Sequence, residues 1–218
     1  MKTLNIKKIN APQELDAAMV PALLDQNGVE FQKIDNVNWK EFPYQPAVEF
    51  RTAHCGAYML VNYRVTEASV RAVAPHDNGR VWEDSCCEFF VQPQAEEPVY
   101  YNFECNCAGT LLLNCGVVGD RKPASEEVLQ SVKRWSTLGR EPFEEKVGEC
   151  AWQMALVIPA KALFNHEVDN FSGLKLHGNF YKCGDLQQTP HFLSWNPIDL
   201  PTPCFHCPEF FGELVYEE

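Results

Sequence analysis

Four polar side chains at regular spacing could contact a ligand from one face of a β-hairpin. They are carboxylates and amides at alternate positions of two short runs: Glu88 in the first, and Asn102, Glu104 and Asn106 in the second. Side chains two residues apart leave the same side of a strand, so this pattern places hydrogen-bonding groups side by side. Trp82 precedes the first run. Because sugars have apolar C–H faces and hydroxyl rims, aromatic rings beside fixed amides and carboxylates predict a carbohydrate-binding surface.

A second set of polar residues could extend the same surface. The run 174–182 alternates, and its polar side carries Lys175, His177, Asn179 and Tyr181. The sugar-binding hypothesis takes Asn179 and Tyr181 as contacts, and Trp195, in the proline-rich loop that follows, as a second aromatic wall. The competing explanation is structural, because most polar residues on the outer face of an antiparallel sheet are merely solvated. Solvation or turn hydrogen bonding accounts equally well for Asn102 and Asn106.

Period-two alternation predicts the hairpin that positions these residues. Cys87, Phe89 and Val91 point to one side of the first run and Glu88 to the other, and residues 99–107 alternate in the same way. About nine or ten such short runs, with little helix, predict an all-β fold: a two-sheet antiparallel β-sandwich with one or two short helices. No repeat or linker divides residues 1–218, so a single domain is expected.

Local signals give further expectations for individual segments. Pro21 should break or kink a helix within residues 12–26, since proline removes a backbone donor. Residues 57–65 and 69–74 are predicted as two strands, and residues 116–127 as a long polar loop. Trp135 and Trp152 lie within strand patterns and are expected in the core.

The charge balance argues against nucleic acid as a partner. The chain has 18 basic and 30 acidic residues, a formal net charge of −12, and no basic run, so the footprint of a phosphate-backbone binder is missing. No stretch approaches the roughly 20 apolar residues of a membrane helix, and the N-terminus lacks an apolar segment of signal-peptide length. We expect a cytoplasmic protein without a membrane partner, or a periplasmic or secreted one if a signal peptide has been removed. The oligomeric state is left open.

Ten cysteines raise the question of metal binding. In a chain of this length without a signal peptide, reduced thiols are the default, and Cys105 and Cys107 lie on the apolar side of their strand. Cys204 and Cys207 form one CxxC motif around His206, but a structural zinc site needs a second pair of ligands and no second CxxC is present. The acidic composition is compatible with calcium, although no EF-hand spacing is found. No cofactor is therefore expected, with calcium as the open alternative.

Glu88 and Glu104 also suggest an enzymatic alternative. A pair of carboxylates is the usual equipment of glycoside hydrolases, and neighbouring strands could bring these two together. One carboxyl must then have a raised pKa in a deep, dry cleft, which a short sheet is not expected to supply. A nucleophile elbow, a P-loop, HExxH and a dinucleotide fingerprint are absent. Non-catalytic binding is the favoured hypothesis, and glycoside hydrolysis the alternative.

The order of several motifs resembles that of family 9 carbohydrate-binding modules, and especially their stand-alone relatives. The motifs are VWEDSCCEFFVQP, YYNFECNCAGTLL, NFYKCG, a tryptophan loop and CPEFFGEL. The family pattern is roughly Trp-x-Asp-Asp/Ser-x-x-Glu-hydrophobic-Phe, then Tyr-x-Phe-x-x-Asn-x-x-Gly, then Pro-Glu-x-Phe-Gly. The resemblance runs from about residue 81 to residue 216 and is weaker over residues 39–73.

This resemblance implies a jelly-roll type of sandwich that holds a sugar, often a chain end, between two tryptophans without catalysis. By their positions in these motifs, Trp82 and Trp195 correspond to the two walls, and Glu88 corresponds to a polar residue that holds the ligand. Residues 100–106 correspond to a strand that makes further sugar contacts. Family members are often attached to xylanases and other polysaccharide-degrading enzymes, which implies a link to polysaccharide catabolism, and some bind calcium. The pair Cys86-Cys87 departs from the small or aliphatic residues usual in the family, and no catalytic domain accompanies the module in this sequence.

Overall fold

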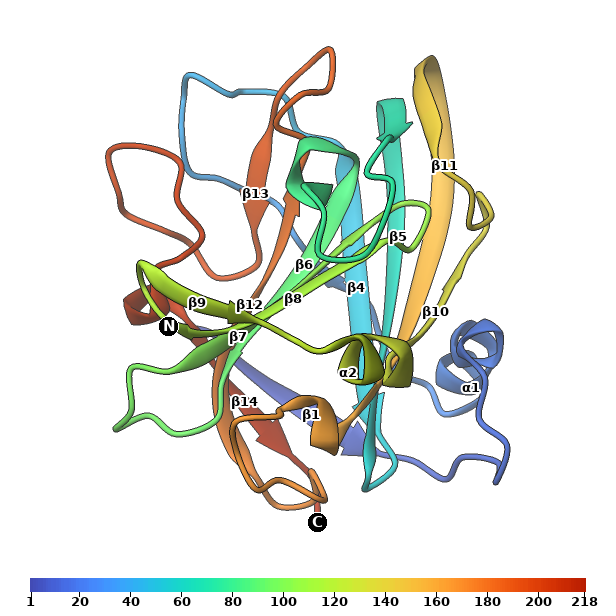
Figure 1. The fold of residues 1–218 in the computed structure, drawn as a ribbon, viewed down its shortest axis with the longest axis vertical. Helices are drawn as coiled ribbons and strands as arrows, with labels where there is room; N and C mark the ends of the chain where they lie inside the picture. The colour runs from blue at the N-terminus through green and yellow to red at the C-terminus, as the bar shows by residue number, and fades with distance from the viewer.

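Two β-sheets packed face to face form most of the molecule, as the computed structural model of residues 1–218 shows (Figure 1). The first sheet contains, in spatial order, β10 (Lys133–Ser136), β11 (Phe143–Pro159), β5 (Tyr58–Ala72) and β4 (Ala47–His54), with β2 (Gln32–Lys33) beside β4. The second contains β14 (Gly212–Tyr216), β12 (Lys175–Cys183), β6 (Cys86–Gln92), β7 (Tyr100–Asn106), β8 (Leu111–Val117) and β9 (Asp120–Pro123). Beside the end of β12 lies β13 (Phe192–Ser194), which pairs with β3 (Asn36–Val37). The predicted all-β sandwich of jelly-roll type is confirmed.

The first strand, β1 (Thr3–Lys8), belongs to both sheets. Its first residues pair with β14 and its last two with β4, and both pairings are parallel. The sandwich is therefore not antiparallel at this strand, which the sequence patterning did not indicate. Period-two patterning shows which face of a strand is buried, but it carries no information about the direction of the neighbouring strand.

Two short helices accompany the sheets, α1 (Val20–Gln26) and α2 (Glu126–Ser131), and 3₁₀ turns lie at Ala17–Met19, Val81–Glu83, Ala160–Ala162 and Pro208–Phe210. Pro21 lies in the first turn of α1, where the missing backbone N–H needs no partner, so it does not break the helix. Residues 116–127, expected to be a loop, contain β9 and the start of α2. No helix is long and apolar enough to cross a membrane.

Strand β5 is continuous over 15 residues, where two shorter strands were predicted. The polar residue Glu67 interrupts the apolar alternation, but its side chain is buried and forms an ion pair with Lys182 of β12, with Nζ 2.9 Å from the carboxylate. The indole N–H of Trp152 donates a hydrogen bond of 2.7 Å to the other carboxylate oxygen. The strand continues because the charge has partners inside the sandwich, and such partners cannot be found from local sequence.

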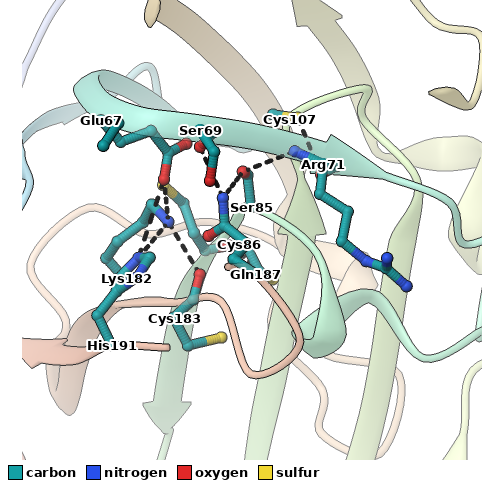
Figure 2. Close-up of polar contacts among 12 residues, drawn as sticks. Glu67, Ser69, Arg71, Ser85, Cys86, Cys107, Lys182, Cys183, Gln187 and His191 are labelled. Atoms are coloured by element: carbon teal, nitrogen blue, oxygen red, sulfur yellow. Dashed lines mark hydrogen bonds and ion pairs between the residues drawn. The ribbon is translucent and has the colours of Figure 1, made fainter. Parts of the chain in front are cut away.

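Figure 2 shows this buried polar cluster between the two sheets. The Lys182 ammonium donates hydrogen bonds to Nε2 of His191 at 2.7 Å and to the carbonyl of Cys183 at 2.9 Å. Burial and the neighbouring ammonium lower the pKa of His191 to about 2, so this ring is neutral at ordinary pH. The cluster joins β5 to β12 through the middle of the molecule.

Stacked aromatic rings fill the main core between the sheets. Phe180 of β12 stacks on Phe50 of β4, with ring centroids 3.7 Å apart, and on Phe89 of β6, with centroids 4.8 Å apart. The outer face of the first sheet is covered by α1, through contacts that include Leu24, Leu60 and Val157. The outer face of the second sheet is covered by the C-terminal loop 196–211, and the candidate site lies beneath that cover.

Candidate functional site

A cavity of about 750 Å³ lies on the outer face of the second sheet. Strands β6, β7, β8 and β9 supply its floor and one side, and Cys183, Asp185, Phe192 and residues 203–206 supply much of the rest. Trp82 lies at its border, in the 3₁₀ turn that precedes β6. This turn is fixed, because the carbonyl of Trp82 accepts a hydrogen bond of 3.1 Å from the backbone N–H of Asp185.

Three of the predicted site residues meet on the cavity floor. Glu88 and Glu104 are directly opposite each other in the β6–β7 register, and Asn102 lies two residues before Glu104 on the same face. The Asn102 amide donates a hydrogen bond of 2.8 Å to the Glu104 carboxyl. All three side chains are at most 4% exposed. The predicted shared face is therefore present, but it is the bottom of a cavity and not the open platform that the sequence suggested.

Arg121 of β9 completes the floor. It was not among the predicted site residues, because residues 116–127 were predicted to be a loop. Its guanidinium lies 3.8 Å from the centroid of the Tyr100 ring and donates hydrogen bonds to the carbonyls of Tyr100 at 2.9 Å and Gly116 at 2.5 Å. The same guanidinium donates to the side-chain oxygen of Asn102. This contact fixes the orientation of the amide, whose nitrogen then faces Glu104.

The acids around the cavity have raised pKa values. Burial raises the pKa of Glu104 to about 7, against the lowering effect of the Asn102 hydrogen bond and the Arg121 charge. Burial, followed by the neighbouring Cys183 and Glu104, raises the pKa of Glu88 well above its ordinary value. Burial and the nearby Glu83 raise the pKa of Asp185 to about 6. The floor is thus a set of hydrogen-bonding groups with little net charge at neutral pH.

Aromatic surface lies around these polar groups. Trp82, Phe192 and Phe205 line the cavity together with Phe90 and His206. The Tyr100 hydroxyl lies 2.8 Å from Nδ1 of His206, and burial followed by the Arg121 charge lowers the pKa of His206 to about 4. The imidazole is consequently an uncharged part of the wall. Phe205 and His206 lie inside the CxxC motif, which drew attention to its sulfur atoms and not to its rings.

Trp195, predicted as the second wall, belongs to the main core. It is 2% exposed and packs edge-on against Phe50 and Phe180, with both pairs of centroids 6.1 Å apart. A Cβ at Gly212 would lie 2.5 Å from its ring, so the backbone of β14 closes over it. Trp195 therefore does not line the cavity. The rings of this proline-rich region that face the cavity are Phe192 and Phe205.

Three other predicted contacts are also structural. Asn179 is buried, and its amide both donates to the carbonyl and accepts from the N–H of Asn196, which anchors the C-terminal loop. Asn106 bonds to the carboxylate of Asp84 at 2.9 Å and accepts two backbone N–H groups of the β7–β8 turn. Tyr181 is fully buried beneath Phe205. None of the three side chains lines the cavity, because a second layer of chain covers the face that the sequence suggested was open.

The CxxC motif does not gather further metal ligands. Cys204 is exposed and Cys207 is buried, and the Cys207 thiol is directed at the carbonyls of Cys204 and Phe205, at 3.3 Å and 3.5 Å. All ten cysteines are free thiols. The one group of three metal-ligating side chains with donor atoms within 4.8 Å of one another is Cys86, Glu88 and Cys183.

A β-sandwich with one large cavity, lined by aromatic rings and floored by buried amide and carboxyl groups, is typical of modules that bind small polar ligands. The chain belongs to carbohydrate-binding family 9, whose family model matches residues 18–216. No curated protein sequence matches the chain.

Solved structures support the same assignment. A Bacteroides uniformis protein, provisionally described as carbohydrate-binding, has 58% identity, a TM-score of 0.97 and 99% coverage of both chains. A family 9 module from Caldicellulosiruptor kristjanssonii, solved with glucose, has a TM-score of 0.59 at 11% identity, with 99% of this chain and 96% of that chain covered. A second structure of a family 9 module from that organism, solved with cellotriose, has a TM-score of 0.61 at 11% identity, with coverages of 99% and 94%. At this identity, the last two show similarity of fold.

Proposed function

We propose that this protein binds a mono- or oligosaccharide, without catalysis, in the cavity above β6, β7 and β8. The observation that carries the proposal is the placement of Trp82 at the border of a cavity whose floor is Glu88, Asn102 and Glu104. Stacking on an aromatic ring matches the apolar face of a sugar, and fixed amide and carboxyl groups match its hydroxyls. The volume of about 750 Å³ is within the range of ordinary small-ligand pockets.

The polar groups of the floor are suited to hydrogen-bonding the hydroxyl groups along one edge of a sugar ring. Arg121 fixes the Asn102 amide, and the amide in turn orients the Glu104 carboxyl, so the ligand meets groups that are already ordered and loses less entropy on binding. The ligands of the Caldicellulosiruptor modules, glucose and cellotriose, make gluco-configured oligosaccharides the first probes to use. We place this binding in polysaccharide catabolism, in keeping with the enzymes to which family 9 modules are often joined.

The geometry favours binding over glycoside hydrolysis. A hydrolase needs one protonated carboxyl as the acid and one ionised carboxylate as the nucleophile or base. Here the same burial raises the pKa of both Glu88 and Glu104, and the Cys183 thiol donates to the Glu88 carboxyl at 3.0 Å. With a pKa of about 7, Glu104 is only partly ionised at neutral pH, and the Glu88 carboxyl is held towards its protonated form.

A glycan array with native and chemically reduced oligosaccharides side by side tests the proposal, followed by calorimetry on the best ligand. In calorimetry, Trp82→Ala should cost about 2–4 kcal/mol of binding free energy, as central aromatic residues do, which is a loss of roughly 30- to 1,000-fold in affinity. Trp135→Ala is the matched control, because Trp135 packs with the α1 cluster on the far sheet. Equal affinity of the wild type and Trp82→Ala would place any sugar outside this cavity, and a blank array would reject the proposal.

A further inference from the structure

Two thiols meet the Glu88 carboxyl beside the cavity floor, and the sugar-binding proposal gives these thiols no role. Cys86 and Cys183 are directly opposite each other in the β6–β12 register, and Glu88 lies two residues after Cys86 on the same face of β6. Their donor atoms all lie within 4.8 Å of one another. We propose that Cys86, Cys183 and Glu88 form a binding site for a thiophilic divalent cation, with Zn²⁺ as the physiological type.

The separations suit a tetrahedral ion. Zinc–sulfur bonds of about 2.3 Å place two tetrahedral sulfur ligands roughly 3.8 Å apart. The three donors already lie within 4.8 Å of one another, and the Cys183 sulfur is 3.0 Å from the nearer Glu88 oxygen. Changes of less than about 1 Å, within the reach of side-chain rotation alone, would bring all three donors to zinc distances. No movement of the strands is required.

The partners of these groups leave them free for a metal. The Cys86 thiol makes a long contact of 3.9 Å to the carbonyl of Cys87 and lies next to the Cys183 thiol. The Cys183 thiol contacts the carbonyl of Trp82 at 3.5 Å and the Glu88 carboxyl. All three side chains are at most 2% exposed, so a bound ion would be shielded from water except on the cavity side. Binding replaces the thiol protons with the cation and releases them to solvent.

The donor types select the ion. Thiolates favour zinc and other soft cations over Ca²⁺ and Mg²⁺, which take oxygen ligands. Glu88 and Cys183 line the cavity, so the fourth position faces it and is open to water or to Asp185, which also lines it. Three protein ligands with one open position is the arrangement of accessible zinc sites and differs from that of closed, four-ligand structural sites. The site therefore differs in kind from the CxxC motif at Cys204 and Cys207.

The test uses the full chain, stripped with a chelator and then titrated with Zn²⁺ against a chromophoric competitor, and separately with Co²⁺. We expect one ion per chain and a near-ultraviolet sulfur-to-cobalt charge-transfer band. Since loss of an outer-shell partner already costs 10- to 100-fold in affinity, loss of a direct ligand in Cys183→Ser or Cys86→Ser should weaken Zn²⁺ binding more than about 100-fold and abolish the band. The Cys204→Ser, Cys207→Ser double variant is the matched control and should bind as the wild type does.

Circular dichroism of each stripped variant separates lost binding from lost folding, and Glu88→Gln provides a ligand change without altering a thiol. Absence of stoichiometric binding in the wild type would overturn the proposal. So would a charge-transfer band that persists in Cys183→Ser and disappears in the CxxC double variant. The inference stands apart from the sugar-binding proposal, since metal binding is measured without sugar, and sugar binding can be measured on the stripped protein.

Discussion

The Phe205 ring lies parallel to the Tyr181 ring, with centroids 4.2 Å apart and an angle of 6° between their planes. The Tyr181 hydroxyl also donates a hydrogen bond of 3.3 Å to the carbonyl of Phe205. Tyr181 is opposite Glu88 in the β6–β12 register, so this stack fastens the C-terminal loop to the sheet beside the cavity floor. A residue predicted to touch the ligand instead supports a wall of the site.

The first prediction concerns this wall. Phe205→Leu keeps an apolar side chain on Tyr181 but removes the ring, so we expect affinity for the cavity ligand to fall by about tenfold while the protein stays folded. Phe205→Ala should in addition lower the free energy of unfolding by about 3 kcal/mol, as large-to-small changes at buried aromatic positions do. Calorimetry and urea unfolding measure the two effects. Phe164→Leu, at an aromatic ring outside the cavity, is the control and should leave affinity unchanged.

The second prediction concerns Arg121, which does not contact the ligand in our proposal but fixes the orientation of the Asn102 amide. Lysine keeps the charge and loses the planar fork that reaches the carbonyls and the amide together. Arg121→Lys should therefore weaken ligand binding by about 1.5 kcal/mol, the value of one hydrogen bond to a charged group. Arg64→Lys, at a guanidinium that bonds to Glu49 on the surface, is the control. Equal affinities in the two variants would show that Asn102 needs no orientation by Arg121.

The third prediction concerns the buried ion pair. Lys182→Met leaves the Glu67 carboxylate without its cation between the sheets, and loss of one partner of a buried pair costs about 3–5 kcal/mol. The double variant Lys182→Met, Glu67→Gln should recover much of that loss, because a neutral amide can still accept the indole hydrogen bond of Trp152. A double-mutant cycle of unfolding free energies measures the coupling, and additive losses would contradict it.

The fourth prediction concerns acid sensitivity. An unfolded histidine titrates near pH 6.5, and His191 in the folded protein near 2. Between these values the unfolded state binds the additional proton, so the stabilising effect of the neutral ring is complete above pH 6.5 and is lost as the pH falls. The loss is about 1.4 kcal/mol for each pH unit in this window. His191→Gln should reduce the pH dependence of the unfolding free energy between pH 6 and 4 by about this amount.

The control for this experiment is His76→Gln, at an exposed ring. It should follow the wild-type profile over the same range, because this ring is exposed and lies outside the buried cluster. An unchanged slope in His191→Gln would mean that His191 accepts a proton inside the folded protein.

The sequence determined the elements and the faces of the central hairpin. Alternation in residues 86–91 and 99–107 is a local property, and it correctly placed Glu88, Asn102 and Glu104 on one side and Phe89 on the other. The motif order correctly indicated the family. These features could be predicted because strand geometry ties the direction of each side chain to its position in the chain.

Only the tertiary structure decided which residues line the cavity and which are packed in the core. Trp195 and Phe205 lie in the same proline-rich region, yet one is packed in the core and the other lines the site, because the path of the loop over the sheet depends on anchors such as Asn179 with Asn196. Arg121 reaches the floor only because β9 pairs with β8. The meeting of Cys86 with Cys183 depends on the pairing of strands nearly one hundred residues apart. Contacts between distant segments leave no periodic signal, so the site could be assembled only in three dimensions.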